Sequence, residues 1–125
     1  MTKFINLLTV LGAAGAVLVG TAPAALAGTD ATNYYGYQSH GHFYSYGEHV
    51  TVYDDYPDGY SGVVEYYRSD TGGHGFLWNG QGAYTSKDFN LGMPEGSTFQ
   101  FRACIGDGSR GVLIACNGTW SYGIA

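Results

Sequence analysis

From residue 47 onward the chain alternates apolar and polar residues in short runs that are separated by turns. The clearest run is TFQFRA at residues 98–103, where Phe99, Phe101 and Ala103 share one side of an extended chain. Turn signals such as DDYPDG at residues 54–59 and Asn79-Gly80 stand between the runs. No window shows the helical period of apolar residues. The pattern predicts strands at residues 49–53, 62–68, 75–78, 84–85, 98–103, 112–116 and 119–122.

Short strands at this regular spacing are typical of an all-β domain. The chain also has 21 glycines and 12 tyrosines, which suits tight turns between strands better than helices. We therefore predict a small antiparallel β-sandwich, immunoglobulin-like or similar, with six to seven strands over residues 47–125.

Residues 28–46 have a different character from the predicted sandwich. They contain no Val, Ile, Leu or Met, so this segment has too little aliphatic material for a core of its own. Its aromatic side chains offer large contact areas, and we predict an extended N-terminal arm that binds a partner. Two alternatives stay open, an edge strand that covers the sandwich and a flexible arm that orders on the partner. The candidate contact residues are Tyr34, Tyr35, Tyr37, His40, His42, Phe43, Tyr44 and Tyr46.

Residues 1–27 have the three parts of a secretory signal peptide. Lys3 gives a charged start, residues 7–19 form an apolar run, and Ala25-Leu26-Ala27 is a small-x-small cleavage site. The predicted mature protein is therefore secreted and extracellular, and we expect no membrane insertion. Without Lys3 it has four basic and ten acidic residues, a balance that argues against nucleic acid as a partner.

Cys104 and Cys116 are the only two cysteines. An even pair in a small secreted domain predicts a disulfide. Because the two cysteines flank the turn at residues 106–111, the bridge is expected to join the two arms of a hairpin.

Several histidines and aspartates could bind a metal ion, but each also has a simpler role. His40 and His42 would share one side of an extended segment, as a metal site could use, but we expect them to be polar members of a binding strip. Asp54, Asp55 and Asp58 could offer oxygen ligands to calcium, yet aspartate is also common in turns of this kind. The sequence lacks a Gly-x-Ser-x-Gly motif and a free thiol, and we predict no enzyme, cofactor or metal.

The chain from residue 47 resembles small secreted proteins of actinomycetes. The residues that carry the resemblance are GEHVTVYD (47–54), DGYS (58–61), VEY (64–66), WN (78–79), NL (90–91), PE (94–95), and FRAC (101–104) with Cys116. Relatives of this kind often carry a second cysteine pair, near the positions that Tyr53 and Tyr84-Thr85 hold here.

This group of proteins is similar to the adaptor (B) component of the umbrella toxin particles of Streptomyces. The resemblance implies a non-enzymatic adaptor that joins a secreted lectin-like protein to the repeat stalk of a large polymorphic toxin. It also implies that the segment before the domain faces the lectin and that the β-domain sits on the repeats. The alternative function is a secreted module that binds carbohydrate or the cell envelope, with Tyr34, Tyr44, Trp78 or Trp120 stacked on sugar rings.

Overall fold

The computed structural model describes residues 27–125, and all of the predicted signal peptide except Ala27 lies outside this range. Within it no helix is long and apolar enough to cross a membrane. The described residues form nine strands, which are β1 (Ala31–Tyr35), β2 (Ser39–Tyr44), β3 (His49–Asp54), β4 (Ser61–Arg68), β5 (His74–Asn79), β6 (Thr85–Asn90), β7 (Thr98–Asp107), β8 (Val112–Cys116) and β9 (Ser121–Ile124).

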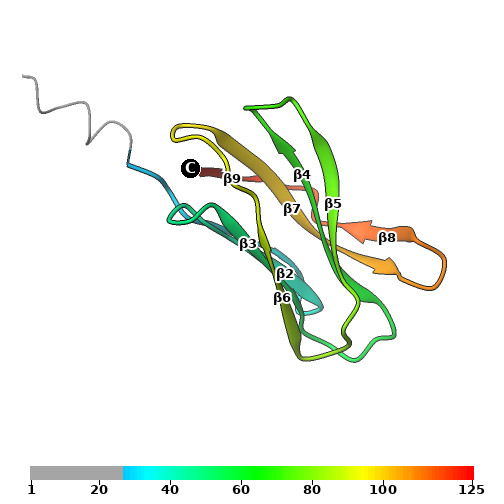
Figure 1. Ribbon diagram of the computed structural model, residues 1–125. Helices are drawn as coiled ribbons and strands as arrows, with labels where there is room; N and C mark the ends of the chain where they lie inside the picture. Colours follow the sequence, from blue (N-terminus) through cyan, green and yellow to red (C-terminus); the bar gives the residue numbers. More distant parts are fainter. Residues whose placement is uncertain (1–26) are drawn as a thin grey trace, which may run out of the picture.

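The strands form two antiparallel sheets that pack face to face (Figure 1). The four-stranded sheet has the order β1-β2-β3-β6. The five-stranded sheet has the order β5-β4-β7, and the far edge of β7 pairs with β9 over its first half and with β8 over its second half. The predicted class, an all-β antiparallel sandwich, is therefore confirmed.

The core lies between the sheets and is mostly aromatic and aliphatic. Phe43 of β2 stacks on Phe99 of β7 with ring centroids 5.1 Å apart, and Phe101 and Tyr66 extend the same aromatic cluster. Val50, Val52, Val64, Met93 and Ala125 complete its buried part. Burial of such side chains is the main stabilising term for a domain of this size.

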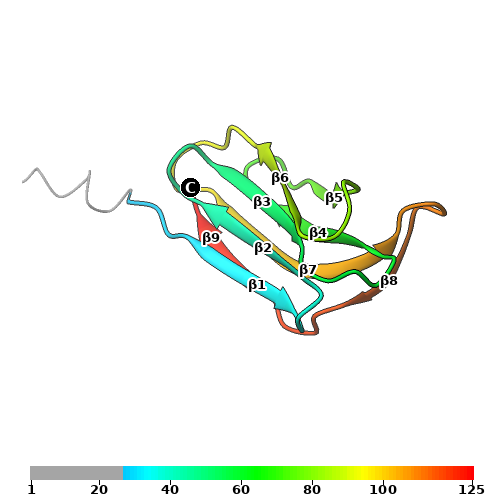
Figure 2. The same ribbon diagram turned by 90° about the horizontal axis from the view of Figure 1, so that it is seen from below.

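The segment predicted as an arm forms two strands of the sandwich. Residues of β1 pair with β2, and β2 pairs in turn with β3, so β2 is an interior strand of its sheet (Figure 2). Its side chains alternate between buried and half-buried, and Phe43 is fully buried. Of the two alternatives, the structure has the strand and not the free arm. The predicted boundary at residue 46 therefore does not separate an arm from a domain.

Close approach of the two sheets depends on a glycine in β2. Gly41 faces Val64 of β4, and a β-carbon at residue 41 would collide with that valine side chain. A short bridge between Thr29 and Ile124 then closes the sandwich beside β1, where β9 of the other sheet runs close by (Figure 2). The N-terminal strands are thus held by both sheets.

Cys104 and Cys116 form the predicted disulfide. They are directly opposite each other in the β7–β8 pair, with Cα atoms 4.0 Å apart. The bridge therefore joins the two arms of a hairpin, as the sequence predicted. The other strand predictions hold in outline, although β6 extends to Asn90 and β9 begins two residues later than expected.

Candidate functional site

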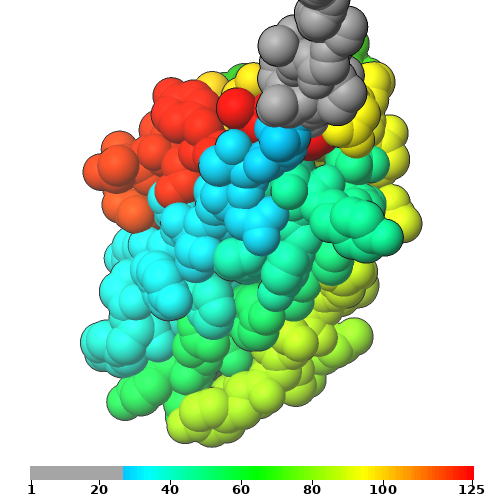
Figure 3. Space-filling view, turned by 90° about the vertical axis from the view of Figure 1, so that its left-hand side faces the viewer, coloured from blue at the N-terminus to red at the C-terminus, as the bar shows by residue number. Residues whose placement is uncertain are grey.

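Half of the candidate contact residues lie on the outer face of the four-stranded sheet, the side of the molecule seen in Figure 3. His40, His42 and Tyr44 alternate along β2 with its buried residues, so they share the outer side. Across the β2–β3 pair they stand opposite Tyr53, Thr51 and His49, respectively. We call this surface, with Tyr34 of β1, the histidine–tyrosine face.

Aromatic rings on the histidine–tyrosine face are stacked on one another. The His40 ring lies between Tyr34 and Tyr53, with centroid distances of 4.8 Å and 4.0 Å and nearly parallel planes to each. Tyr44 stacks on His49 at 4.5 Å. Such cross-strand ring pairs restrict side-chain rotation, so much of the face is ordered before any partner arrives.

Each histidine of this face has a carboxylate within ion-pair distance. Nδ1 of His40 lies 2.5 Å from Oδ2 of Asp55, and Nδ1 of His49 lies 2.6 Å from Oδ1 of Asp88. The hydrogen bond from His49 holds the pKa of Asp88 below its usual value, although partial burial opposes the shift. The three histidines therefore do not share one carboxylate, and each is oriented by its own.

The third pair involves a hydroxyl group as well. Nδ1 of His42 is hydrogen-bonded to Oγ1 of Thr32, and Oδ2 of Asp30 lies 3.8 Å from Nε2. A hydroxyl, an imidazole and a carboxylate in this order also occur in hydrolases. Here they lie on an open sheet surface, and neither Thr32 nor His42 lines any cavity described below. The hydroxyl group and the carboxylate both contact the His42 ring and orient it.

The other predicted contact residues have different positions. Tyr37 in the β1–β2 turn and Tyr46 in the β2–β3 turn are 69% and 94% exposed. Tyr35 is half-buried at the end of β1. The prediction of Phe43 as a contact residue is wrong, because its side chain belongs to the core and has no exposed surface. Its neighbours in the sequence, His42 and Tyr44, point the other way.

Three residues of the histidine–tyrosine face were not predicted as contacts. His49, Thr51 and Tyr53 occupy alternate positions of β3. Their alternation with Val50 and Val52 was the signal, because the buried valines assign the other three to the outer side. The sequence does not show that β2 and β3 pair, so it could not predict that these residues lie beside those of β2.

Metal-ligating side chains do not converge on this face. Within residues 27–125 one group of three potential ligands lies close together, namely Glu65 with Cys104 and Cys116, and both sulfurs are used in the disulfide. His40 and His42 share a side, as predicted, but each has its own partner. The carboxylates of Asp55 and Asp58 likewise make separate contacts, with His40 and with Gln38.

The outer face of the five-stranded sheet has a second polar and aromatic cluster. Glu65 of β4 accepts hydrogen bonds from His74 of β5 and Arg102 of β7, both at 2.8 Å. The Arg102 guanidinium lies over the Trp120 ring at 4.5 Å, and Tyr67 stacks on His74. We call this surface, which also includes exposed Phe76 and Tyr122, the glutamate–tryptophan face.

The carboxylate at the centre of this second face is nearly buried. Burial raises the pKa of Glu65, but hydrogen bonds from His74 and Arg102 outweigh it, so the pKa lies below the ordinary value. Glu65 therefore remains ionised near neutral pH and fixes two side chains from neighbouring strands.

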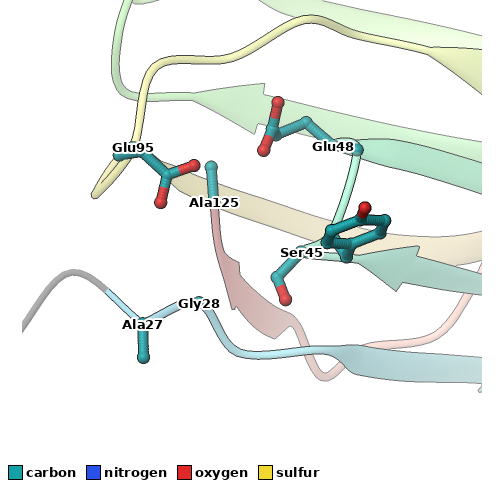
Figure 4. Close-up of a pocket in the computed structure, with 8 residues that line it drawn as sticks. Ala27, Gly28, Ser45, Glu48, Glu95 and Ala125 are labelled. Carbon is teal, nitrogen blue, oxygen red and sulfur yellow. The ribbon is translucent and has the colours of Figure 1, made fainter. Parts of the chain in front are cut away.

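A hollow lies where the two ends of the described chain meet (Figure 4). It has a volume of about 660 Å³ and is lined on different sides by Ser45, Glu48, Glu95 and Ala125. Its charged side chains are the two glutamates, which come from separate loops and project toward each other (Figure 4). It is an acidic surface hollow at one end of the sandwich.

Comparisons of the chain with protein-family models, with curated proteins and with solved structures find no match.

Proposed function

We propose that this chain is a secreted, non-enzymatic adaptor that joins a lectin-like protein to the repeat stalk of a large polymorphic toxin. The observation that supports this role best is the presence of two unlike aromatic faces on opposite sheets. An adaptor must hold two partners at the same time. The outer sides of a sandwich can do so without the partners colliding.

The histidine–tyrosine face is the proposed contact for the lectin-like protein. It contains Tyr34, His40, His42 and Tyr44 from the N-terminal segment that the resemblance assigns to this partner. Tyrosines that are already stacked lose little rotational freedom on binding, and such residues often dominate binding energy. The lectin therefore meets a preformed sheet surface in this proposal, not an extended peptide.

The glutamate–tryptophan face is the proposed contact for the repeats. Phe76 and Tyr122 are exposed on either side of the central Glu65 network, and a monomer gains little from exposing them. The disulfide lies in the same sheet and suits an oxidising, extracellular setting.

The adaptor role can be tested by capture with two matched double variants. Tyr34→Ser with Tyr44→Ser removes rings from the histidine–tyrosine face, and Phe76→Ser with Tyr122→Ser removes them from the glutamate–tryptophan face. Affinity-tagged protein from the native host is isolated from culture medium and its partners are identified by mass spectrometry. The wild type should capture a secreted lectin-like protein and a repeat-bearing toxin together.

Each double variant should lose one partner and retain the other, so that each is the control for its counterpart. Circular dichroism and thermal melting establish that both variants are folded. Retention of both partners by both variants would contradict the proposal. Binding of the purified protein alone to a glycan array would favour the carbohydrate-binding alternative, in which the exposed rings stack on sugars.

A further inference from the structure

A small cavity lies at the loop end of the sandwich, between the β3–β4 and β5–β6 connections. It has a volume of about 200 Å³, and its lining includes Asp54, Tyr56, Tyr60 and Gly82. Whole small-molecule ligands usually need cavities of roughly 300 Å³ or more. The size therefore suits the end group of one side chain.

The cavity is lined by an almost fully buried carboxylate. Asp54 is the last residue of β3 and continues the inward side of that strand, after Val50 and Val52. It is only 3% exposed, in contrast to the half-buried Asp55 that follows it. A carboxylate in this position is costly unless a cation or several hydrogen bonds compensate its charge.

No such compensation for Asp54 comes from the side chains of residues 27–125. Asp55 pairs with His40, and Asp58 accepts a hydrogen bond from Gln38, but no side chain in this part of the chain pairs with Asp54. Burial raises its pKa, the Tyr56 N–H partly opposes this, and the charges of Asp58 and Asp55 raise it further. The free protein thus keeps a poorly compensated acid at the cavity.

Tyrosines and the absence of a basic side chain complete the chemistry of the cavity. The lining contains Tyr56 and Tyr60 but neither lysine nor arginine. Arg110, on the neighbouring β7–β8 turn, is already held by Asp107 at 2.8 Å. Tyrosine rings attract cations through their faces, and a carboxylate pairs with them directly.

We infer that this cavity binds an arginine side chain of a partner protein. A planar guanidinium can bond to both oxygens of a carboxylate while it stacks on tyrosine, and it loses less hydration than an ammonium group on entry. The inference concerns a surface apart from the two faces above. It does not require the partner to be a lectin or a toxin.

Nuclear magnetic resonance titration of the purified protein tests the inference. The probe is N-acetyl-arginine amide, compared with the uncharged citrulline analogue and with the lysine analogue. The arginine probe should cause saturable shifts at the amides of Tyr56, Tyr60 and Gly82. The citrulline probe should cause none, and the lysine probe should bind more weakly.

Two variants that each remove one negative charge identify the carboxylate that binds the arginine probe. Asp54→Asn should weaken arginine binding by at least about tenfold, since the charged hydrogen bonds are lost. Asp58→Asn, in the same loop, should change it by no more than about twofold, because the Asp58 carboxylate is bonded to Gln38 and does not line the cavity. Equal shifts with citrulline, equally tight binding of lysine, or unchanged binding by Asp54→Asn would overturn the inference.

A pH titration covers the case in which Asp54→Asn does not fold. In the wild type, arginine binding should disappear as the pH falls through the raised pKa of Asp54, before the carboxylates of lower pKa are protonated. Binding that persists after Asp54 is protonated would equally overturn the inference.

Discussion

The two sheets fill their inner sides in different ways. The five-stranded sheet contributes large apolar residues such as Phe99 and Phe101, whereas the buried residues of β1 and β2 in the other sheet are Asn33, Ser39, Gly41 and one large apolar residue, Phe43. Both sets are buried to the same degree. A strand can therefore belong to a core without aliphatic residues, provided that its polar groups find partners across the sandwich.

Asn33 shows how the polar positions are satisfied. Along the far edge of β7, β9 pairs as far as Phe101 and β8 pairs from Cys104, which leaves a gap between them. The Asn33 side chain fills this gap, since its Oδ1 accepts the Ala103 N–H at 2.7 Å and its Nδ2 donates to Ser121 at 2.9 Å. An amide can do both because it is donor and acceptor at once.

The most severe test of this comparison is to replace Phe43, the one large apolar residue that is buried in β1 and β2. Phe43→Ala should lower the free energy of unfolding by about 3–5 kcal/mol, the usual cost of removing a buried phenylalanine. Urea unfolding followed by tryptophan fluorescence gives the value. Phe76→Ala is the matched control, because Phe76 is exposed and should cost less than about 1 kcal/mol. Similar values for the two variants would mean that β2 is not part of the core.

Replacement of Asn33 should have the next largest effect. Asn33→Ala removes the acceptor of the Ala103 N–H and should cost about 1–3 kcal/mol, the penalty for an unpaired buried donor. Asn33→Asp keeps an acceptor at the same place but removes the donor to Ser121, so its effect separates the two roles. Amide hydrogen exchange at Ala103 should accelerate in Asn33→Ala. Unchanged exchange there would rule out the proposed role of the gap-filling amide.

The sequence predicted the sandwich well where apolar residues alternate, and poorly in β1 and β2. Val50, Val52, Phe99 and Phe101 assign the inner sides of their strands directly, and the two cysteines identify their hairpin. In β2 the inward residues Ser39 and Gly41 are not apolar, so alternation gave no signal. Their role depends on residues far away in sequence, such as the Cys104 carbonyl that accepts the Ser39 hydroxyl.

The candidate site, like the fold, was predicted only in part. The shared side of His40 and His42 followed from strand geometry, and both lie on the histidine–tyrosine face. The exclusion of Phe43 from that face needed the position of the opposite sheet. The glutamate–tryptophan face joins β4, β5 and β7, and no local pattern indicated that these residues meet.

On the glutamate–tryptophan face one carboxylate, Glu65, binds two side chains, whereas each histidine of the other face has its own carboxylate. Glu65→Gln tests the shared carboxylate. The change weakens two hydrogen bonds to a nearly buried carboxylate and should cost about 1–2 kcal/mol at neutral pH. Because its folded pKa is lowered, this stabilisation is present above the unfolded pKa of about 4.3 and is lost as pH falls through the folded value. Urea unfolding at neutral pH and near pH 3 should therefore show a difference that shrinks in acid. An equal difference at both would mean that the charge of Glu65 is not involved.

Asp88→Asn tests a separate pair on the histidine–tyrosine face and should have the smallest effect. The side chain of Asp88 is 53% exposed, so losing its pair with His49 should cost no more than about 0.5 kcal/mol, and salt should reduce the cost further. The change should leave the His40 ring resonances unaltered, because His40 is held by Asp55 and not by Asp88. In Glu65→Gln, by contrast, the resonances of both His74 and Trp120 should move, since one carboxylate orients His74 and the Arg102 that lies over Trp120. Movement of the His40 signals in Asp88→Asn would show that the histidine–tyrosine face is also one coupled network, so that its pairs could not be altered one at a time.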